Sequence, residues 1–345
     1  MSDNTASSAA LPVLTVRDLK LHYFTSKGVV RALDGLSFDL LPGETIGLVG
    51  ESGCGKTTTG VALLNMPSPP GRIVEGSIRI DGTEIVGLGD HELRRKVRWS
   101  KISMVFQGAM NCLTPVYTIR KLMRETYAEH FVGERIDAAA IEELMRKYVT
   151  LVGLPEHVLG RYPHELSGGM KQRVVIAMAL FLEPKVIVMD EPTTALDVIV
   201  QAQILNLIKR LKRELKLSYI FITHDLATEA EVADRILVMY AGKMAELGSN
   251  EEIFGPVGSR HGPLHPYTQK LLASTPLLRK KVSELAFIPG APPDLIDPPA
   301  GCRFAPRCSF AKEKCRSVEP PVAEIENRHM VACWKAMEDP EYVRA

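Results

Sequence analysis

The chain has 345 residues, of which 46% are hydrophobic and 24% charged, as is usual for a globular protein that buries a sizeable core. Its 42 basic and 41 acidic residues leave a net charge of +1, so no global basic field argues for nucleic-acid binding. The longest uninterrupted apolar run, residues 174–182, is far shorter than a membrane span. We therefore expect a cytosolic protein without signal peptide or transmembrane helix, whose six cysteines are thiols or metal ligands rather than disulfides.

The first patterned stretch begins at residue 14. Residues 1–13 are mostly small or polar and predict a disordered tail. Apolar side chains then recur in residues 14–24 and again in residues 29–40, which predicts strands separated by a turn at residues 26–28. Tyr23 lies near the end of the first of these segments. It could stack on a nucleotide base, but its spacing alone favours a half-buried strand aromatic.

Residues 50–57 read Gly-Glu-Ser-Gly-Cys-Gly-Lys-Thr, which is the phosphate-binding P-loop pattern. A buried strand is predicted before it at Thr45–Val49, and a helix after it at Thr58–Asn65. The glycines allow a tight turn whose N–H groups point at a phosphate, and the helix N-terminus favours an anion. Lys56 is expected to reach the β- and γ-phosphates, and Thr57 to place its hydroxyl on Mg²⁺.

A short strand and a helical segment follow the P-loop region. Residues 102–106 predict a strand that stops at Gln107, and a glutamine at a strand end is usually just a polar terminus. Apolar residues at helical spacing predict helices within residues 120–130 and 137–153. We expect these helices to form an insert between two strands of one sheet.

Two further stretches place polar groups beside predicted helices and strands. Residues 167–169, Ser-Gly-Gly, precede an apolar helix at 174–182 and can be either a helix N-cap or an anion site. The buried strand that begins at residue 186 ends in Asp190 and Glu191. In a P-loop protein, Asp190 is the second Mg²⁺ anchor and Glu191 could accept a proton from an attacking water.

A helix at 198–215 and a buried strand at 218–223 come next, and His224 follows that strand directly. Residues 235–247 then read as a hairpin. In open α/β sheets, ligands lie outside the carboxyl ends of the strands. This rule places one set of side chains along a common rim: Lys56, Asp190, Glu191 and His224.

Six motifs therefore stand in one order: the P-loop, Gln107, Leu166–Met170, the strand ending in Asp190 and Glu191, Ala195-Leu196-Asp197, and His224. In this order the chain resembles, over about residues 14–250, the nucleotide-binding subunit of an ATP-binding cassette (ABC) transporter. The resemblance implies an α/β fold with a P-loop NTPase core, an antiparallel β subdomain and a helical subdomain at about residues 108–180. No motif departs from the family pattern, which implies a competent ATPase.

The resemblance also implies roles for individual residues. Ser167 and Gly169 would contact the γ-phosphate of ATP held by a second subunit, and Asp197 would bridge the two sites. Tyr23 would stack on adenine, against the interpretation from its spacing. The implied catalytic residues are Glu191, His224 and Lys56, and the implied Mg²⁺ ligands are Thr57, Gln107 and Asp190. The set implied to bind ATP is Tyr23, Gly50, Ser52, Gly53, Cys54, Gly55, Lys56, Thr57, Thr58, Gln107, Ser167, Gly168, Gly169 and Asp197.

The last part of the chain narrows the resemblance. His265-Pro266-Tyr267-Thr268, a proline-rich stretch at 289–299 and the segment Gly301–Cys308 are similar to the C-terminal extension of the oligopeptide/dipeptide branch. This likeness divides the chain into a cassette, residues 14–255, and an extension, residues 256–345. It implies uptake of di- or oligopeptides, with oligosaccharides or nickel chelates as alternatives.

The branch also implies partners and a location. The partners would be a second ABC ATPase subunit, identical or homologous, two transmembrane permease subunits and an extracytoplasmic substrate-binding protein. The chain would then attach peripherally to the cytoplasmic face of the inner membrane. The competing interpretation is a soluble ABC ATPase that acts on nucleic acid or ribosomes. One cassette, no long heptad run and a net charge of +1 disfavour it.

Four of the six cysteines lie close to the C-terminus: Cys302, Cys308, Cys315 and Cys333. Four thiolates among prolines and charges predict a metal-stapled module, with zinc, an iron–sulfur cluster or plain buried thiols as candidates, and His329 could replace one thiolate on zinc. The spacing does not decide between these candidates. The family resemblance favours a 4Fe–4S cluster with a structural role over the other candidates. A metal- or redox-sensing role stays open.

Overall fold

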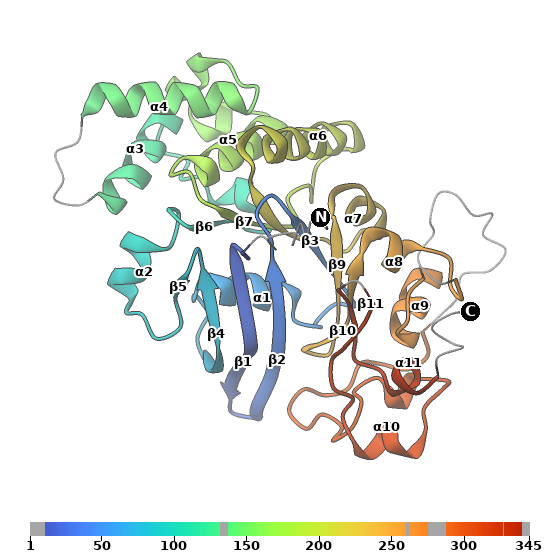
Figure 1. Cartoon of the computed structure of the whole chain (residues 1–345). Helices are drawn as coiled ribbons and strands as arrows, with labels where there is room; N and C mark the ends of the chain where they lie inside the picture. Colours follow the sequence, from blue (N-terminus) through green and yellow to red (C-terminus); the bar gives the residue numbers. More distant parts are fainter. Residues whose placement is uncertain (1–10, 132–136, 260–261, 275–287, 327, 340–345) are drawn as a thin grey trace, which may run out of the picture.

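The computed structural model describes residues 11–131, 137–259, 262–274, 288–326 and 328–339. The predicted tail at residues 1–13 lies outside the described residues except for its last three. Two β-sheets and a group of helices make up the body of the molecule, and the C-terminal part packs beside them (Figure 1). In the part of the chain that the structure describes, no helix is long and apolar enough to cross a membrane.

The smaller sheet is antiparallel and has the strand order β2-β1-β4-β5. Alternate apolar side chains of its first strand, such as Leu14 and Val16, are fully buried, which confirms the predicted strand face. They pack over helix α1 (Lys56–Leu63) and one face of the larger sheet. The strands are β1 (Leu14–Thr25), β2 (Gly28–Leu40), β4 (Gly71–Ile80) and β5 (Thr83–Glu84).

The larger sheet has eight strands in the order β11-β12-β10-β9-β3-β8-β7-β6, and the five from β9 to β6 are parallel. Every residue of β3, β7 and β8 is buried, as expected for parallel strands covered on both faces. The strands are β3 (Thr45–Val49), β6 (Ile102–Val105), β7 (Val186–Asp190), β8 (Ser218–Ile222), β9 (Arg235–Tyr240), β10 (Lys243–Ser249), β11 (Ala323–Glu326) and β12 (His329–Val331).

Helices cover the larger sheet, and three of them form the predicted insert. Helices α3, α4 and α5 share an apolar core in which the rings of Tyr148 and Phe181 meet edge to face. Helix α5 begins at Gly168, not at Val174 as predicted, because Ser167 caps its N-terminus by accepting a hydrogen bond from the Met170 N–H. Gly168 and Gly169, which precede the predicted helix, form the first turn of α5.

The main helices are α1 (Lys56–Leu63), α2 (Asp90–Lys96), α3 (Ile119–His130), α4 (Ala138–Leu151), α5 (Gly168–Leu180), α6 (Val198–Leu215) and α7 (Leu226–Val232). The later helices are α8 (Asn250–Phe254), α9 (Pro266–Ala273), α10 (Glu313–Ser317) and α11 (Trp334–Glu338). Short 3-10 turns lie at Ala109–Cys112, Glu156–Gly160, Pro163–Glu165 and Ala305–Arg307.

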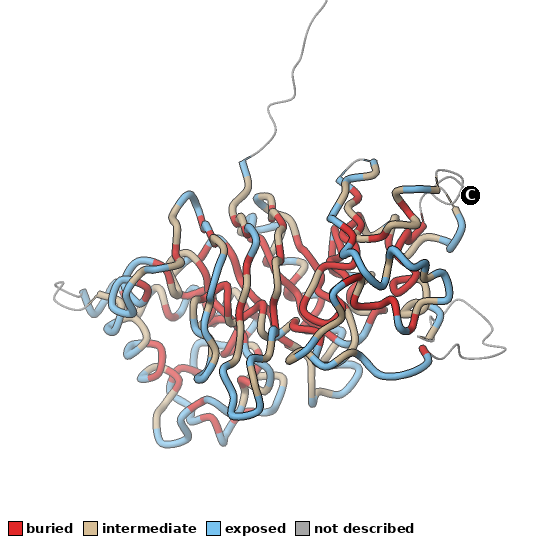
Figure 2. Tube along the Cα trace, turned by 90° about the horizontal axis from the view of Figure 1, so that it is seen from below, coloured by how far each residue is buried: buried red, intermediate tan, exposed pale blue. Residues whose placement is uncertain are grey.

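The C-terminal part is joined to the larger sheet rather than merely tethered to it. Strand β12 pairs with β10, and β11 pairs with β12. The buried carboxylate of Glu246 on β10 accepts hydrogen bonds from the backbone N–H groups of Leu264 and His265, and it also contacts His329 Nε2 at 2.7 Å. Buried segments accordingly continue from the middle of the molecule into this part (Figure 2).

Candidate active site

The P-loop joins β3 to α1 and requires glycine at two positions. Gly50 has a φ of 149°, and a Cβ there would lie 2.2 Å from the Met239 carbonyl oxygen. Gly55 has a φ of 109°, and a Cβ there would lie 2.9 Å from the Ala32 carbonyl oxygen. Any larger residue would push the loop away from its neighbours, so these two glycines fix how closely the loop can turn.

The two P-loop side chains predicted to act on phosphate and metal make hydrogen bonds within the chain. Lys56 Nζ donates to the carbonyl oxygens of Gly50 at 2.7 Å and Glu51 at 3.2 Å. The Thr57 hydroxyl donates to Asp190 Oδ1 at 3.4 Å. Ser52 and Gly53 are exposed at the turn, whereas Cys54 is buried, and burial raises the pKa of its thiol.

Asp190 ends strand β7 and is almost completely buried. Burial raises its pKa to about 6, although the hydrogen bond from Thr57 acts in the opposite direction. A buried carboxylate paired with a hydroxyl offers hard oxygen ligands, and a nearby cation would offset the burial penalty. The donor set therefore fits Mg²⁺.

Glu191 follows β7 and contacts residues that follow the neighbouring strands β6 and β8. Its carboxylate accepts hydrogen bonds from Gln107 Nε2 at 2.8 Å and from the Thr194 hydroxyl at 2.9 Å, and His224 Nδ1 lies 3.1 Å from Oε1. Burial raises its pKa, but these hydrogen bonds outweigh burial and hold the pKa below the usual value. Its φ of 48° is unusual for a non-glycine residue. An ionised carboxylate is thus held in a defined orientation at the rim.

Strand ends alone predict a rim of Lys56, Asp190, Glu191 and His224, and the structure brings Glu191 and His224 into contact there. The position of Gln107 predicts only a polar strand terminus, but Gln107 also donates to Glu191. Sequence reasoning missed Thr194, which donates to the same carboxylate. A threonine three residues after a strand end carries no signal on its own, because its role depends on the tight turn that begins at Glu191.

A second group of predicted residues lies apart from this cluster. Ser167 and Gly168 are exposed at the start of α5, and Asp197 is exposed at the start of α6, where it accepts a hydrogen bond from the Val200 N–H. Within the described ranges, no hydrogen bond or ion pair joins these residues to the P-loop. Tyr23 is half-buried on β1 and packs closely against Gly71.

The four C-terminal cysteines line one pocket. Burial raises the pKa of the Cys302 thiol to about 11, and the nearby Cys333, Cys308 and Cys315 thiols contribute to this rise. The Phe310 N–H donates to Cys308 Sγ at 3.4 Å. However, among the described residues no group of three His, Cys, Asp or Glu side chains is placed to hold a metal ion.

His329 does not line this pocket. Its Nε2 lies 2.7 Å from Glu246 Oε1 and its Nδ1 lies 3.9 Å from Glu252, so both ring nitrogens face carboxylates. The structure therefore does not support His329 as a replacement for a thiolate.

Sequence reasoning also missed two contacts between the C-terminal part and the P-loop. The Tyr267 hydroxyl accepts a hydrogen bond from the Glu51 N–H at 2.8 Å, and Arg307 forms an ion pair with the Glu51 carboxylate. No spacing rule could have found them, because these partners lie more than two hundred residues apart in sequence.

Comparison with known proteins agrees with this geometry. The family model described as "ABC transporter" matches residues 33–194, and the model described as "Oligopeptide/dipeptide transporter, C-terminal region" matches residues 245–315. The chain is 43% identical to the dipeptide transport ATP-binding protein DppD of Bacillus subtilis, over 93% of this chain and 94% of the relative. It is also 43% identical to the oligopeptide transport ATP-binding protein OppD of Escherichia coli, over 97% and 96%.

Two solved structures are similar in fold. A dimeric post-hydrolysis state of the ATP-binding cassette MJ0796 with ADP and Pi has a TM-score of 0.60 and 26% identity, over 69% of this chain and 98% of that one. The structure of cbiO1 from Clostridium perfringens has a TM-score of 0.59 and 28% identity, over 70% and 90%. With its P-loop, its strand-end carboxylates and its C-terminal region, the chain belongs to the ATP-binding subunits of oligopeptide and dipeptide ABC transporters.

Proposed function

We propose that this ATPase drives the uptake of di- or oligopeptides across a membrane. One observation supports the chemistry most strongly: Glu191 is an ionised carboxylate held by Gln107, Thr194 and His224 beside the P-loop. The names of the relatives, dipeptide and oligopeptide transport ATP-binding proteins, support the substrate class. Oligosaccharides and metal chelates are the alternative substrates.

Phosphate binding is assigned to the P-loop and to the first turn of α1. Backbone N–H groups there would surround the phosphates, and the helix dipole would favour their charge. Lys56 would exchange its present carbonyl partners for the β- and γ-phosphates. Tyr23 would stack on adenine. The phosphate-binding residues are Gly50, Ser52, Gly53, Cys54, Gly55, Lys56, Thr57 and Thr58.

Hydrolysis is assigned to the carboxyl ends of β6, β7 and β8. Thr57, Gln107 and Asp190 would hold Mg²⁺, which neutralises phosphate charge when bound. Glu191 would take a proton from the attacking water, because its carboxylate is ionised and its hydrogen bonds fix its orientation. His224, whose side chain is 72% exposed, would hold Glu191 and the γ-phosphate in register.

A second ABC subunit, identical or homologous, would complete the site. Ser167 and Gly168 are exposed and Gly169 is half-buried at a helix N-terminus, which suits the γ-phosphate of ATP bound to that partner. Asp197 is followed by Val198 and Ile199, which are 79% and 72% exposed, as expected for a surface that a partner covers. The MJ0796 structures are described as dimeric, which supports a cassette pair.

The transporter would contain two permease subunits, and this chain would contact them through the helical insert at about residues 107–153, within the helical subdomain at about 108–180. Its surface carries a hollow of about 470 Å³ lined by one side of α3, and Val116 beside it is 71% exposed. The chain would then lie peripherally on the cytoplasmic face of the inner membrane, while an extracytoplasmic binding protein supplies the solute. Within this assignment, residues 14–255 are the cassette and 256–345 the extension.

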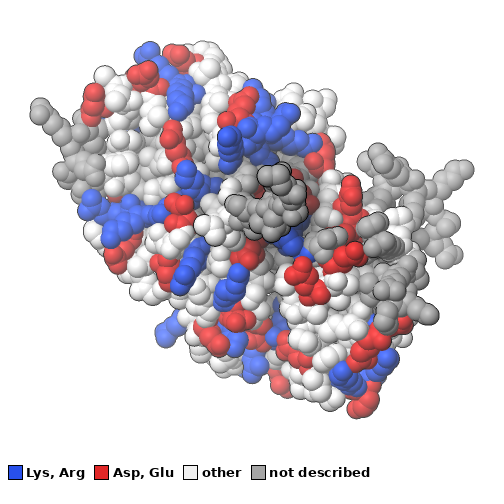
Figure 3. Space-filling model, viewed as in Figure 1, with Lys and Arg blue, Asp and Glu red and all other residues white. Residues whose placement is uncertain are grey.

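Nucleic acid is not a partner in this proposal. Figure 3 shows Lys and Arg interspersed with Asp and Glu on the visible face, and the net charge is only +1. A protein that neutralises many phosphates needs a basic stripe or patch.

For the cysteine pocket we propose a 4Fe–4S cluster, with zinc as the alternative. All four cysteines line the pocket, and an N–H group points at Cys308 Sγ, as is common around cluster thiolates. A single ion needs its ligands gathered more tightly than a four-iron cluster does. Protein purified without oxygen should be brown and contain about four irons per chain. Colourless anaerobic protein with one zinc, or with no metal, would reject the cluster.

The function is tested by reconstituting the chain with its co-purifying membrane subunits and binding protein in vesicles. ATP should drive uptake of a labelled di- or oligopeptide, and the Glu191→Gln variant should abolish this uptake while retaining ATP binding. Unlabelled peptide should compete, whereas an oligosaccharide or a nickel chelate should not. ATP-dependent uptake of either alternative solute, with no uptake of peptide, would contradict the proposed substrate.

A further inference from the structure

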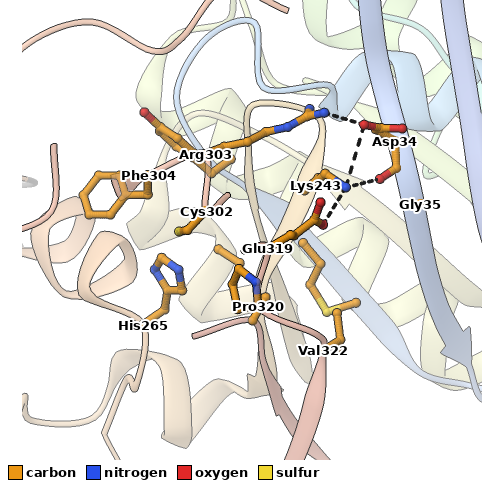
Figure 4. A pocket seen from close by; sticks show the side chains of 14 residues that line it. Asp34, Gly35, Lys243, His265, Cys302, Arg303, Phe304, Glu319, Pro320 and Val322 are labelled. Atoms are coloured by element: carbon orange, nitrogen blue, oxygen red, sulfur yellow. Dashed lines mark hydrogen bonds and ion pairs between the residues drawn. The ribbon is translucent and has the colours of Figure 1, made fainter. Parts of the chain in front are cut away.

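A short loop between two cysteines of the pocket carries two buried arginines. Arg303 and Arg307 lie within residues 302–308 and are 5% and 7% exposed. Arg303 donates to Asp34 on β2 (Figure 4). It also donates to the Ala241 carbonyl oxygen. Arg307 contacts the P-loop instead. The loop at residues 302–308 therefore contacts the nucleotide-binding core at two places.

The contact between Arg307 and Glu51 is bidentate. Arg307 Nη1 lies 2.6 Å from Glu51 Oε2, and Nη2 lies 2.9 Å from Oε1. The same guanidinium donates to the Pro289 carbonyl oxygen at 2.8 Å and to the Tyr240 hydroxyl at 3.2 Å. The guanidinium is therefore fixed on several sides, and a planar fork held in this way binds a carboxylate in one orientation.

Glu51 is the second residue of the P-loop and touches the predicted phosphate-binding groups. Its carbonyl oxygen accepts hydrogen bonds from the Cys54 N–H and from Lys56 Nζ, both at 3.2 Å. Its N–H donates to the Tyr267 hydroxyl of α9. The C-terminal part thus holds this residue by both its backbone and its side chain.

We propose that Arg307 is a positioning residue for ATP binding that acts through Glu51. Arg307 turns the Glu51 carboxylate away from the phosphates, neutralises it, and keeps the P-loop backbone in its phosphate-binding shape. Without this partner, a carboxylate would be free beside a triphosphate of like charge. This inference rests on the proposed function in one respect only, which is that the P-loop binds ATP.

Equilibrium binding of ATP to the full-length protein tests the proposal without relying on hydrolysis or transport. Arg307→Gln should weaken ATP affinity about ten-fold, which is about 1.4 kcal/mol. Glu51→Gln should weaken it less, because the charge left unpaired is then the Arg307 cation, which attracts the triphosphate instead of repelling it. The double variant Arg307→Gln/Glu51→Gln should bind ATP about as well as Glu51→Gln alone, so that removing the carboxylate rescues the arginine variant.

The matched control is Arg17→Gln. Arg17 also makes a bidentate pair, with Asp39 at 2.8 Å for both contacts, on the antiparallel sheet. This variant should bind ATP like the wild type. Arg307→Lys, which keeps the charge but loses the fork, should bind ATP with intermediate affinity and replaces Arg307→Gln if that variant does not fold.

Two outcomes would overturn the proposal. One is ATP affinity within two-fold of wild type for folded Arg307→Gln, or for Arg307→Lys in its place. The other is a loss of affinity that Glu51→Gln does not relieve, which would mean that Arg307 only stabilises the fold. Failure of the proposed transport function looks different, because wild-type protein would then bind ATP but would not drive peptide uptake.

Discussion

The strand-end site and the cysteine pocket are both built from side chains on loops, but different interactions hold them. At the strand ends, Glu191 and its neighbours follow parallel strands directly, so the sheet itself positions them. Among the described residues, the cysteine pocket is lined by short helices and the loops between them. Its loops are held by buried ion pairs and hydrogen bonds to the rest of the protein, among them those of Glu246, Arg303 and Arg307.

Because of this difference, the sheet itself positions the strand-end residues, whereas the cysteine pocket depends on contacts with distant parts of the chain. Parallel strands impose a common edge on residues that follow them, whatever lies elsewhere in the chain. The C-terminal part instead depends on the core for its polar partners and for two ladder contacts of β12 with β10. Arg307 lies in the loop between Cys302 and Cys308 and binds Glu51 of the P-loop, so it joins the cysteine pocket to the nucleotide-binding core.

The largest effect should come from the anchor of the C-terminal part. Glu246→Ala removes a buried acceptor shared by two N–H groups and His329. Breaking such a buried charged network should lower the free energy of unfolding by about 3–5 kcal/mol, measured by urea denaturation. Glu75→Ala, which removes an exposed partner of Lys20, should cost about 1 kcal/mol or less. Equal losses for both variants would show that Glu246 is no special anchor.

A change at Ser167 should separate ATP binding from ATP turnover. Ser167→Arg should leave ATP affinity within about two-fold of wild type but lower turnover in the assembled transporter by about 10²–10³-fold, as the loss of a charge-stabilising group does. Ser167→Thr keeps the hydroxyl and the N-cap and should stay near wild type. If Ser167→Arg weakened ATP binding and turnover equally, Ser167 would act on its own P-loop, and the need for a second subunit would be contradicted.

The smallest effect concerns Glu229 of α7, which is fully buried against Gly47 of β3. Burial raises its pKa well above 4.5, so the folded state keeps a proton that the unfolded state releases above about that pH. Stability is therefore greatest below the unfolded pKa and should fall as pH rises, by up to about 1.4 kcal/mol per pH unit. Glu229→Gln cannot titrate, so its stability relative to wild type should grow between pH 5 and pH 7. Parallel stability curves would show that Glu229 is ionised in the folded protein.

The strands and helices near the strand-end site could be predicted because their signals are local. The buried strand at Thr45–Val49 and the helix at Val198–Leu215 have the predicted bounds, and the strand that begins at Val186 ends one residue earlier than predicted, at Asp190. The start of α5 was wrong because Ser-Gly-Gly reads equally as a loop and as a capped first turn. Strands β11 and β12 were not predicted, since four and three residues at a sheet edge carry little periodic signal.

The candidate site divides in the same way. Lys56, Asp190, Glu191 and His224 could be assigned to one rim from strand ends alone, whereas the contact of Gln107 with Glu191 could not. Thr194 required the turn geometry, and Arg307 required a contact across 256 residues of sequence. Long-range ion pairs of this kind leave no pattern in the residues that form them, so only the folded chain reveals them.

The role of Glu191 as the general base of ATP hydrolysis is tested most directly by the single-turnover rate at which the assembled transporter hydrolyses saturating labelled ATP. Glu191→Gln should slow the chemical step by about 10²–10⁴-fold while ATP affinity stays near wild type. Near-normal single-turnover rates in this variant would show that hydrolysis does not need the Glu191 carboxylate, and Glu191 would then not be the general base.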